Sequence, residues 1–218
     1  LLADATSKMA SIKVVNLSKC PLTGATRNRR GIWENIDSDM TGFIALCGVL
    51  GKLHEVNLSG CQLGPTSAAE LGKAISSADA SLTSLCCGSN PIKDEGMAVL
   101  LDAVKDVALI EFDIAKTEIG PPTAKKLAEV LSDATPFTTS LNSLTVDSTG
   151  SRKLSMGSPD YASSERAYAS GPKTYTLTAG ETSIDLSQKN LGSADVTLLA
   201  AWVQRPNVIG SIAHIVLD

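Results

Sequence analysis

A unit of strand, turn and helix recurs along the chain, and the complete copy between Leu53 and Ile75 constrains the fold more than any other feature. Alternation of apolar and polar residues around Val56 predicts a short strand with one buried face. Residues 64–65 (Gly-Pro) then break the strand, and apolar residues at helical spacing predict a helix capped by Thr66 or Ser67. The spacing is L-x-x-L-x-L-x-x-(N/C)-x-L, at Leu53, Val56, Leu58, Cys61 and Leu63.

The same spacing returns before and after this copy. Leu58 and Cys87 are 29 residues apart, and Cys87 and Ile114 are 27 apart, which leaves room for a true helix after each strand. The paired strand positions of the other copies are Val15 and Leu17, Leu85 and Cys87, Phe112 and Ile114, Leu144 and Val146, Ile184 and Leu186, and Ile215 and Leu217.

The long period, the Asn or Cys that follows the strand in three copies (Cys20, Cys61 and Asn90), and the helix pattern G-x-x-x-A-x-x-L at Gly64, Ala68 and Leu71 resemble the ribonuclease-inhibitor-like class of leucine-rich-repeat proteins. The resemblance implies an α/β fold: a right-handed solenoid in a horseshoe arc, with a parallel β-sheet on the concave side and helices on the convex side. We expect one domain over residues 1–218, with about six copies and partial ends, cut from a longer chain. In particular, residues 1–10 are expected to end a helix of a preceding repeat.

Two insertions interrupt the repeats, at about residues 23–38 and 150–174. The first ends in Asp37 and Ser38, which predict an N-cap for the helix that follows. The second is rich in Ser, Gly and Ala and has no helical periodicity, so we expect a loop in place of a helix, either mobile or locally packed. After it, Tyr175 and Leu177 alternate with threonines and predict a β-hairpin leading into the sixth strand.

Between the buried strand positions lie residues that must face the concave side. They are small, polar and acidic, which suggests an acidic groove for a basic partner, although an ordinary solvated sheet face explains them more simply. The candidate binding residues of this face are Glu55, Asn57, Glu111, Asp113, Asp147 and Asp185.

The insertions carry the residue types that dominate protein–protein hot spots, which the concave face lacks. The first insertion contributes Arg27, Arg29, Arg30 and Trp33 as candidate partner-binding residues, and the second contains Tyr161, Arg166 and Tyr168. Long loops on a rigid scaffold are common places for function. The alternative is that the first insertion packs on a neighbouring helix, with Trp33 covering a helix end.

Charge and composition narrow the classes of partner and compartment. The net charge is −4 and no long basic run occurs, which argues against nucleic-acid binding. No stretch reaches the roughly 18 apolar residues of a membrane-spanning helix. The five cysteines are odd in number, and Cys20, Cys61 and Cys87 fall on core positions, which predicts a reducing, intracellular compartment, most simply the cytoplasm, with an organelle left open.

Catalytic readings find little support in the residues. The two histidines, His54 and His214, lie about five repeats apart, so they cannot share a metal or act as one acid–base pair. Cys86 faces the concave side among acidic neighbours, which oppose thiolate formation. Residues 120–122 (Gly-Pro-Pro) lack the lysine of a phosphate loop, and capping explains residues 37–39 better than calcium does.

The sequence therefore predicts a non-catalytic protein–protein interaction module with a protein partner, no cofactor and no metal. The alternative is a structural subunit of a larger assembly that packs through its convex helices and its repeat ends.

Overall fold

The computed structural model describes residues 12–50, 52–76, 81–150 and 171–217. Five short strands lie next to one another in chain order and pair in parallel, so the predicted α/β fold with a parallel sheet is confirmed. They are β1 (Val14–Asn16), β4 (Glu55–Asn57), β5 (Ser84–Cys86), β6 (Glu111–Asp113) and β7 (Ser143–Asp147). The predicted helix end at residues 1–10 and most of the second insertion, including Tyr161, Arg166 and Tyr168, lie outside the described residues.

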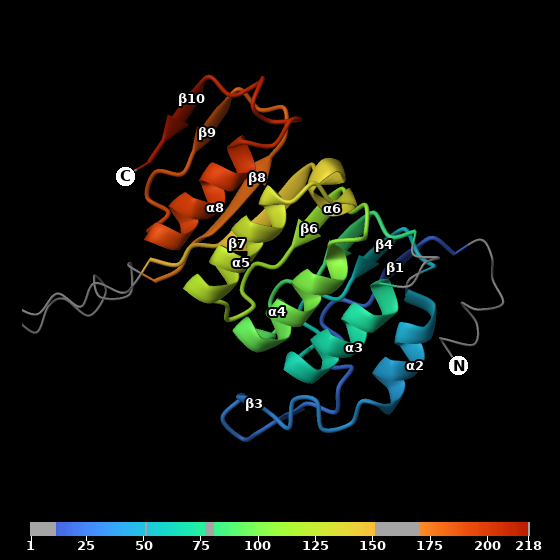
Figure 1. Ribbon diagram of the computed structural model, residues 1–218. Helices are drawn as coiled ribbons and strands as arrows, with labels where there is room; N and C mark the ends of the chain where they lie inside the picture. Colours follow the sequence, from blue (N-terminus) through green and yellow to red (C-terminus); the bar gives the residue numbers. More distant parts are fainter. Residues whose placement is uncertain (1–11, 51, 77–80, 151–170, 218) are drawn as a thin grey trace, which may run out of the picture.

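The main helices form a row on one face of the strands, each in contact with the next (Figure 1). In order along the row they are α2 (Thr41–Leu50), α3 (Pro65–Ile75), α4 (Lys93–Val104), α5 (Pro121–Ser132) and α8 (Ser193–Val203). The short α6 (Pro136–Ser140) connects α5 to β7. The strands β4, β5 and β6 thus lead directly into α3, α4 and α5.

One hydrophobic cluster fills the space between the strands and the helices. Val56, Leu58 and Leu63 are buried under the sheet, and Leu71 and Ile75 meet them from α3, as the spacing predicts. Burying each such side chain contributes about 1.5–3 kcal/mol. The apolar periodicity of the copies therefore accounts for the core.

The strands β1, β4, β5 and β6, and the later strand β9 (Ser183–Asp185), are each followed by a turn with a residue at positive φ. In β4 the Asn57 side chain accepts a hydrogen bond from the Ser59 N–H at 3.0 Å, and Asp113 accepts one from Ala115 N–H at 3.0 Å. Asn16 and Asp185 do the same in their units. Just beyond, one residue takes positive φ; these residues are Lys19, Gly60, Ser89, Lys116 and Gln188. Only Gly60 adopts this conformation without steric cost.

The helix caps differ from those predicted. Neither Thr66 nor Ser67 caps α3 with its side chain; instead the carboxylate of Asp37 accepts hydrogen bonds from the N–H groups of Gly64, Thr66 and Ser67. Asp37 therefore caps the helix of the following copy rather than α2. At the start of α2, the Asp39 side chain accepts a hydrogen bond from the Thr41 N–H at 3.0 Å.

The sheet departs from the prediction after β7. The strand β8 (Thr174–Thr178) contains the predicted alternation but pairs antiparallel with β7, with Leu144 opposite Leu177. Because β8 occupies that edge, the sixth predicted strand, β9 (Ser183–Asp185), cannot join the sheet. It pairs in parallel with β10 (His214–Val216) in a separate two-stranded sheet. The predicted hairpin between β8 and β9 is therefore wrong.

Two buried polar side chains hold the last unit to the rest. Asp195, at the start of α8, accepts hydrogen bonds from Thr149, Gly192 and the Tyr175 hydroxyl. Arg205, 2% exposed, donates to the carbonyls of Thr138 and Leu141. Polar groups this deep are tolerated only when hydrogen-bonded. These contacts join β7, β8 and α6 to α8.

One cysteine position was predicted wrongly. Cys61 and Cys87 are fully buried, but Cys20 is exposed. Cys20 follows β1, which is the edge strand of the described sheet. Within the described residues, its unit therefore packs against a neighbouring unit on one side and not on both.

Candidate partner-binding surfaces

The first insertion folds into a β-hairpin with a fixed base. Its strands are β2 (Thr26–Arg27) and β3 (Trp33–Glu34), paired antiparallel. At the base, buried Thr23 donates its hydroxyl to the Gln62 carbonyl at 2.7 Å, and its own carbonyl accepts from Asp39 N–H at 3.1 Å. Gly24 has φ +77° and packs so closely on Asp39 that a Cβ there would clash. The two ends of the insertion are thus tied together and to the next unit.

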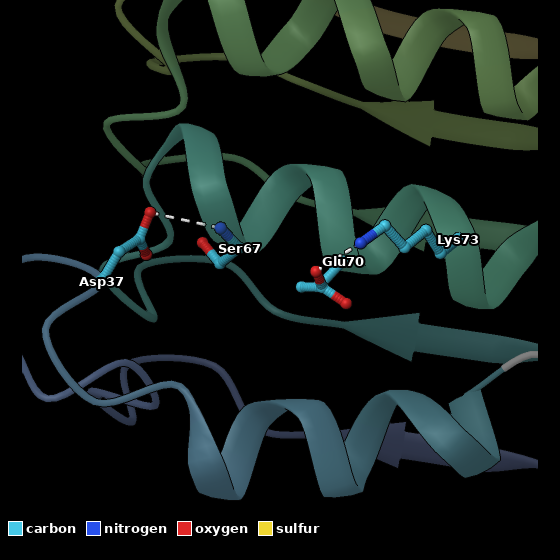
Figure 2. Close-up of polar contacts among 4 residues, drawn as sticks. All are labelled: Asp37, Ser67, Glu70 and Lys73. Carbon is cyan, nitrogen blue, oxygen red and sulfur yellow. Dashed lines mark hydrogen bonds and ion pairs between the residues drawn. The ribbon is translucent and has the colours of Figure 1, made fainter.

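The base of the hairpin also reaches the start of α3. Figure 2 shows the Asp37 carboxylate at the N-terminal end of this helix, with a dashed line to the Ser67 amide, a distance of 3.2 Å. Further along the same helix, Lys73 and Glu70 form an ion pair of 2.6 Å. The positive end of the helix dipole favours a carboxylate at this point. These contacts make Asp37 the connection between the hairpin and the repeat scaffold.

The tip of the hairpin is held by Asn28. Its side-chain oxygen accepts hydrogen bonds from the N–H groups of Arg30 and Ile32, and its amide nitrogen donates to Glu34 at 2.6 Å. Gly31, with φ +77°, completes the turn. The chain direction at the tip is therefore set before any partner arrives.

The four predicted residues of the insertion lie together on this hairpin. Arg27, Arg29 and Arg30 are exposed, and Trp33 is half-buried. The Arg27 guanidinium lies over the Trp33 ring, 4.6 Å from its centroid. Such stacking holds an arginine without neutralising it.

A groove of about 530 Å³ separates the hairpin from the turns that follow β4, β5 and β6. We call it the hairpin groove. Its lining residues are Gly31, Ile32, Trp33, Ile36, Gln62, Ser89, Asn90, Pro91, Lys116 and Glu118. A second hollow, of about 520 Å³, shares Ile36, Pro91 and Glu118 with it and continues past the start of α3. Trp33 therefore borders a groove beside turns of the scaffold.

Sequence reasoning missed the scaffold side of this groove. Pro91 belongs to the turn after β5, Lys116 and Glu118 belong to the turn after β6, and these residues carry no sequence signal of their own. Lys116 and Glu118 take positive φ, at 57° and 59°. The signal that could have found them is the equal position of these turns in neighbouring copies, which places them at one edge of the sheet.

The predicted sheet-face residues are brought together only in part. Glu55, Asn57, Glu111, Asp113 and Asp147 lie on the outer face of the six-stranded sheet, and Glu55, for example, pairs in register with Ser84 of the next strand. Asp185 lies on the separate sheet of β9 and β10.

Many of these polar side chains already have partners within the chain. Asn57, Asp113 and Asp185 accept hydrogen bonds from the turns that follow them. Asp147 accepts from Lys116 N–H at 2.7 Å and from the Thr174 hydroxyl at 2.5 Å. Glu55, Glu111 and Asp185 are the exposed carboxylates of the set, and the first two line a hollow of about 260 Å³ at the β1 side.

Burial and the negative charges on this face oppose ionisation of Asp113 and Cys86. Burial, and then the charge of Asp147, raise the pKa of Asp113. Burial, followed by Asp113 and Glu111, also raises the pKa of the Cys86 thiol, as the acidic surroundings predict. A thiol with a raised pKa is a poor nucleophile at neutral pH.

Within the described ranges, the structure brings together no group of His, Cys, Asp and Glu side chains that could hold a metal ion. In the same part of the chain, every helix is too short or too polar to cross a membrane.

Residues 52–72 match a family model described as "Leucine Rich repeat". The match coincides with the copy that begins at Leu53, and it supports a leucine-rich-repeat protein. A comparison with curated proteins gives no match.

Proposed function

We propose that the chain is a non-catalytic protein–protein interaction module, built as one leucine-rich-repeat domain over residues 1–218. The scaffold is a right-handed solenoid like that of the ribonuclease-inhibitor-like class, and it acts inside the cell, most simply in the cytoplasm. Its repeats position the binding residues and take no part in chemistry. The matching repeat and the parallel row of strand–helix units support this proposal.

The hairpin of the first insertion is the proposed recognition surface. The observation that carries this choice is its fixed geometry: Thr23, Asn28 and Asp37 order its base and tip through hydrogen bonds to the chain itself. A preordered surface loses little conformational entropy on binding. Arg and Trp side chains presented in this way are frequent hot-spot residues.

A crosslinking pull-down from native extract tests the proposal. Wild-type chain is compared with a hairpin variant in which Arg27, Arg29, Arg30 and Trp33 are changed to Ala. A matched variant, Glu55→Gln with Glu111→Gln, changes the open sheet face instead. We expect the wild type and the sheet-face variant to capture the same protein, and the hairpin variant to lose it while keeping its circular-dichroism spectrum. Equal capture by all three would refute the hairpin as the site.

A structural subunit of a larger assembly is the second candidate function. Apolar side chains exposed on three helices of the row favour it: Ile44 on α2, Val99 on α4 and Val196 on α8. Sedimentation at increasing concentration distinguishes the two functions. Self-association that is lost in an Ile44→Ser, Val99→Ser, Val196→Ser variant would support the assembly role, whereas a monomer at all concentrations would contradict it.

A further inference from the structure

We infer that the hairpin groove receives an extended, acidic segment of a partner protein. This inference rests on the proposed function and adds the chemistry of the partner. The hairpin carries Arg29 and Arg30 directly before Gly31, which lines the groove, and the groove itself offers apolar surface and length.

The charge of the hairpin is not balanced within the described part of the chain. None of the carboxylates there lies within ion-pair distance of Arg27, Arg29 or Arg30. The nearest acidic residues in sequence are occupied: Glu34 accepts from Asn28, and Asp37 accepts from the amides of α3. An arginine side chain without an ion-pair partner can bind a carboxylate of another molecule through paired hydrogen bonds.

The two exposed arginines at the tip are the carboxylate-binding groups. Arg27 is held against the Trp33 ring, whereas the side chains of Arg29 and Arg30 are exposed. Asn28 holds the turn that contains both residues, since its side-chain oxygen accepts from the N–H groups of Arg30 and Ile32, so both guanidinium groups belong to one short turn. Two acidic side chains close together in a partner would match them.

The apolar residues that line the groove favour a partner segment with an apolar side chain next to those carboxylates. Ile32 is 57% exposed, and Ile36, Trp33 and Pro91 add apolar surface beside it. Such an exposed aliphatic and aromatic wall is typical of an anchor pocket. The continuation past Ile36 and Pro91 into the second hollow gives room for several residues of an extended chain.

The second hollow limits how far the acidic part of the partner segment can extend. Glu95 and Glu118 line it together with Lys93, so a carboxylate placed there would meet like charge. The partner segment should therefore carry its acidic residues at the hairpin end and neutral residues beyond the anchor.

A protein segment fits these charges better than a nucleic acid. Nucleic acids require a series of phosphate contacts along a basic stripe. Beside the arginines of the hairpin, the two hollows are lined by only two lysines, Lys116 in the hairpin groove and Lys93 in the second hollow, and the net charge of the chain is −4.

Peptide display gives a direct test. The immobilised 218-residue chain is used to select from a library of random 12-residue peptides, and the best peptide is then measured by fluorescence anisotropy. We expect the selected peptides to be enriched in paired Asp or Glu beside an apolar residue. Arg29→Gln with Arg30→Gln should weaken binding about 10-fold or more, since two charge-assisted contacts are lost. Lys52→Gln with Lys125→Gln removes the same charge outside the groove and should leave binding unchanged.

Three results would overturn the inference: no enriched peptide, enriched peptides without acidic residues, or equal weakening by both double variants. A single-stranded 20-nucleotide probe that binds through the arginines when no peptide does would also overturn it. The pull-down separates this failure from that of the proposed function. If a protein is captured through the hairpin but acidic peptides fail, only the inference on partner chemistry falls; if the hairpin variant also captures normally, both fall.

Discussion

Asp37 shows how one carboxylate connects the insertion to the scaffold. It belongs to the first insertion, yet both of its oxygens accept backbone N–H groups at the start of α3. Sequence proximity suggested that it capped α2, because local spacing reveals only neighbours along the chain. The true partner lies 27 to 30 residues ahead, in the next unit.

Removing this carboxylate should destabilise the fold. We expect Asp37→Ala to lower the free energy of unfolding by about 1–2 kcal/mol, since three amides lose their acceptor at a helix start. Urea unfolding followed by circular dichroism measures the change. Asp106→Ala serves as the control, because that exposed carboxylate has no hydrogen bond or ion pair to the described residues. An equal effect of the two substitutions would contradict the assigned role of Asp37.

Asp113 carries an electrostatic cost that depends on pH. Burial and the nearby Asp147 raise its pKa above 3.8, so the native state keeps this proton at pH values where the unfolded chain has released it. The contribution of Asp113 to stability therefore falls as the pH rises through that interval, and at pH 7 the ionised group is unfavourable.

Asp113→Asn should consequently stabilise the protein at pH 7. The amide keeps the turn hydrogen bond, as Asn16 and Asn57 show at the equivalent positions. Urea midpoints at pH 7 and pH 3.5 check this expectation: the advantage of the variant should be present at pH 7 and shrink at pH 3.5. A wild type that is at least as stable at pH 7 would count against it.

At the scale of the element, the helix row depends on small residues where helices approach closely. A Cβ added at Gly96 of α4 would lie 2.7 Å from the Cα of Pro65 and 3.1 Å from the Cβ of Ala68, both in α3. Gly48 of α2 is also inside a helix, but nothing lies within 4 Å of the same added atom.

These two glycines should respond oppositely to alanine. Gly96→Ala should cost about 1–3 kcal/mol, because the backbone of α3 must move away. Gly48→Ala should gain up to about 1 kcal/mol from the higher helix propensity of alanine. Thermal unfolding of both variants beside the wild type measures the difference. A stabilising Gly96→Ala would show that the two helices do not pack as described.

At the scale of the whole molecule, much of the fold could be predicted because the sequence repeats one unit. Strands, helices and core followed from apolar spacing, because each copy repeats the same burial at Val56, Leu85 and Phe112. The end of the parallel sheet could not be foreseen, since the pattern around Tyr175 specifies a strand but not its partner. Its antiparallel place on β7 depends on long-range contacts such as the Tyr175 hydroxyl to Asp195.

The candidate site was predictable only on one side. The composition of residues 23–38 pointed to Arg29, Arg30 and Trp33 as binding residues, a hypothesis that remains to be tested. The opposite wall of the groove is made of turns from separate copies. Their nearness follows from the stacking of units, and no local pattern encodes it.

Site-specific photo-crosslinking tests the central claim most directly. A photoreactive amino acid replaces Ile32 at the hairpin, or Ile209 after α8, which is similarly exposed at 64%. In native extract, the account predicts that the Ile32 position crosslinks to a discrete protein and that the Ile209 position does not. If both positions crosslink to the same proteins, or only to other copies of this chain, the hairpin is not the recognition surface.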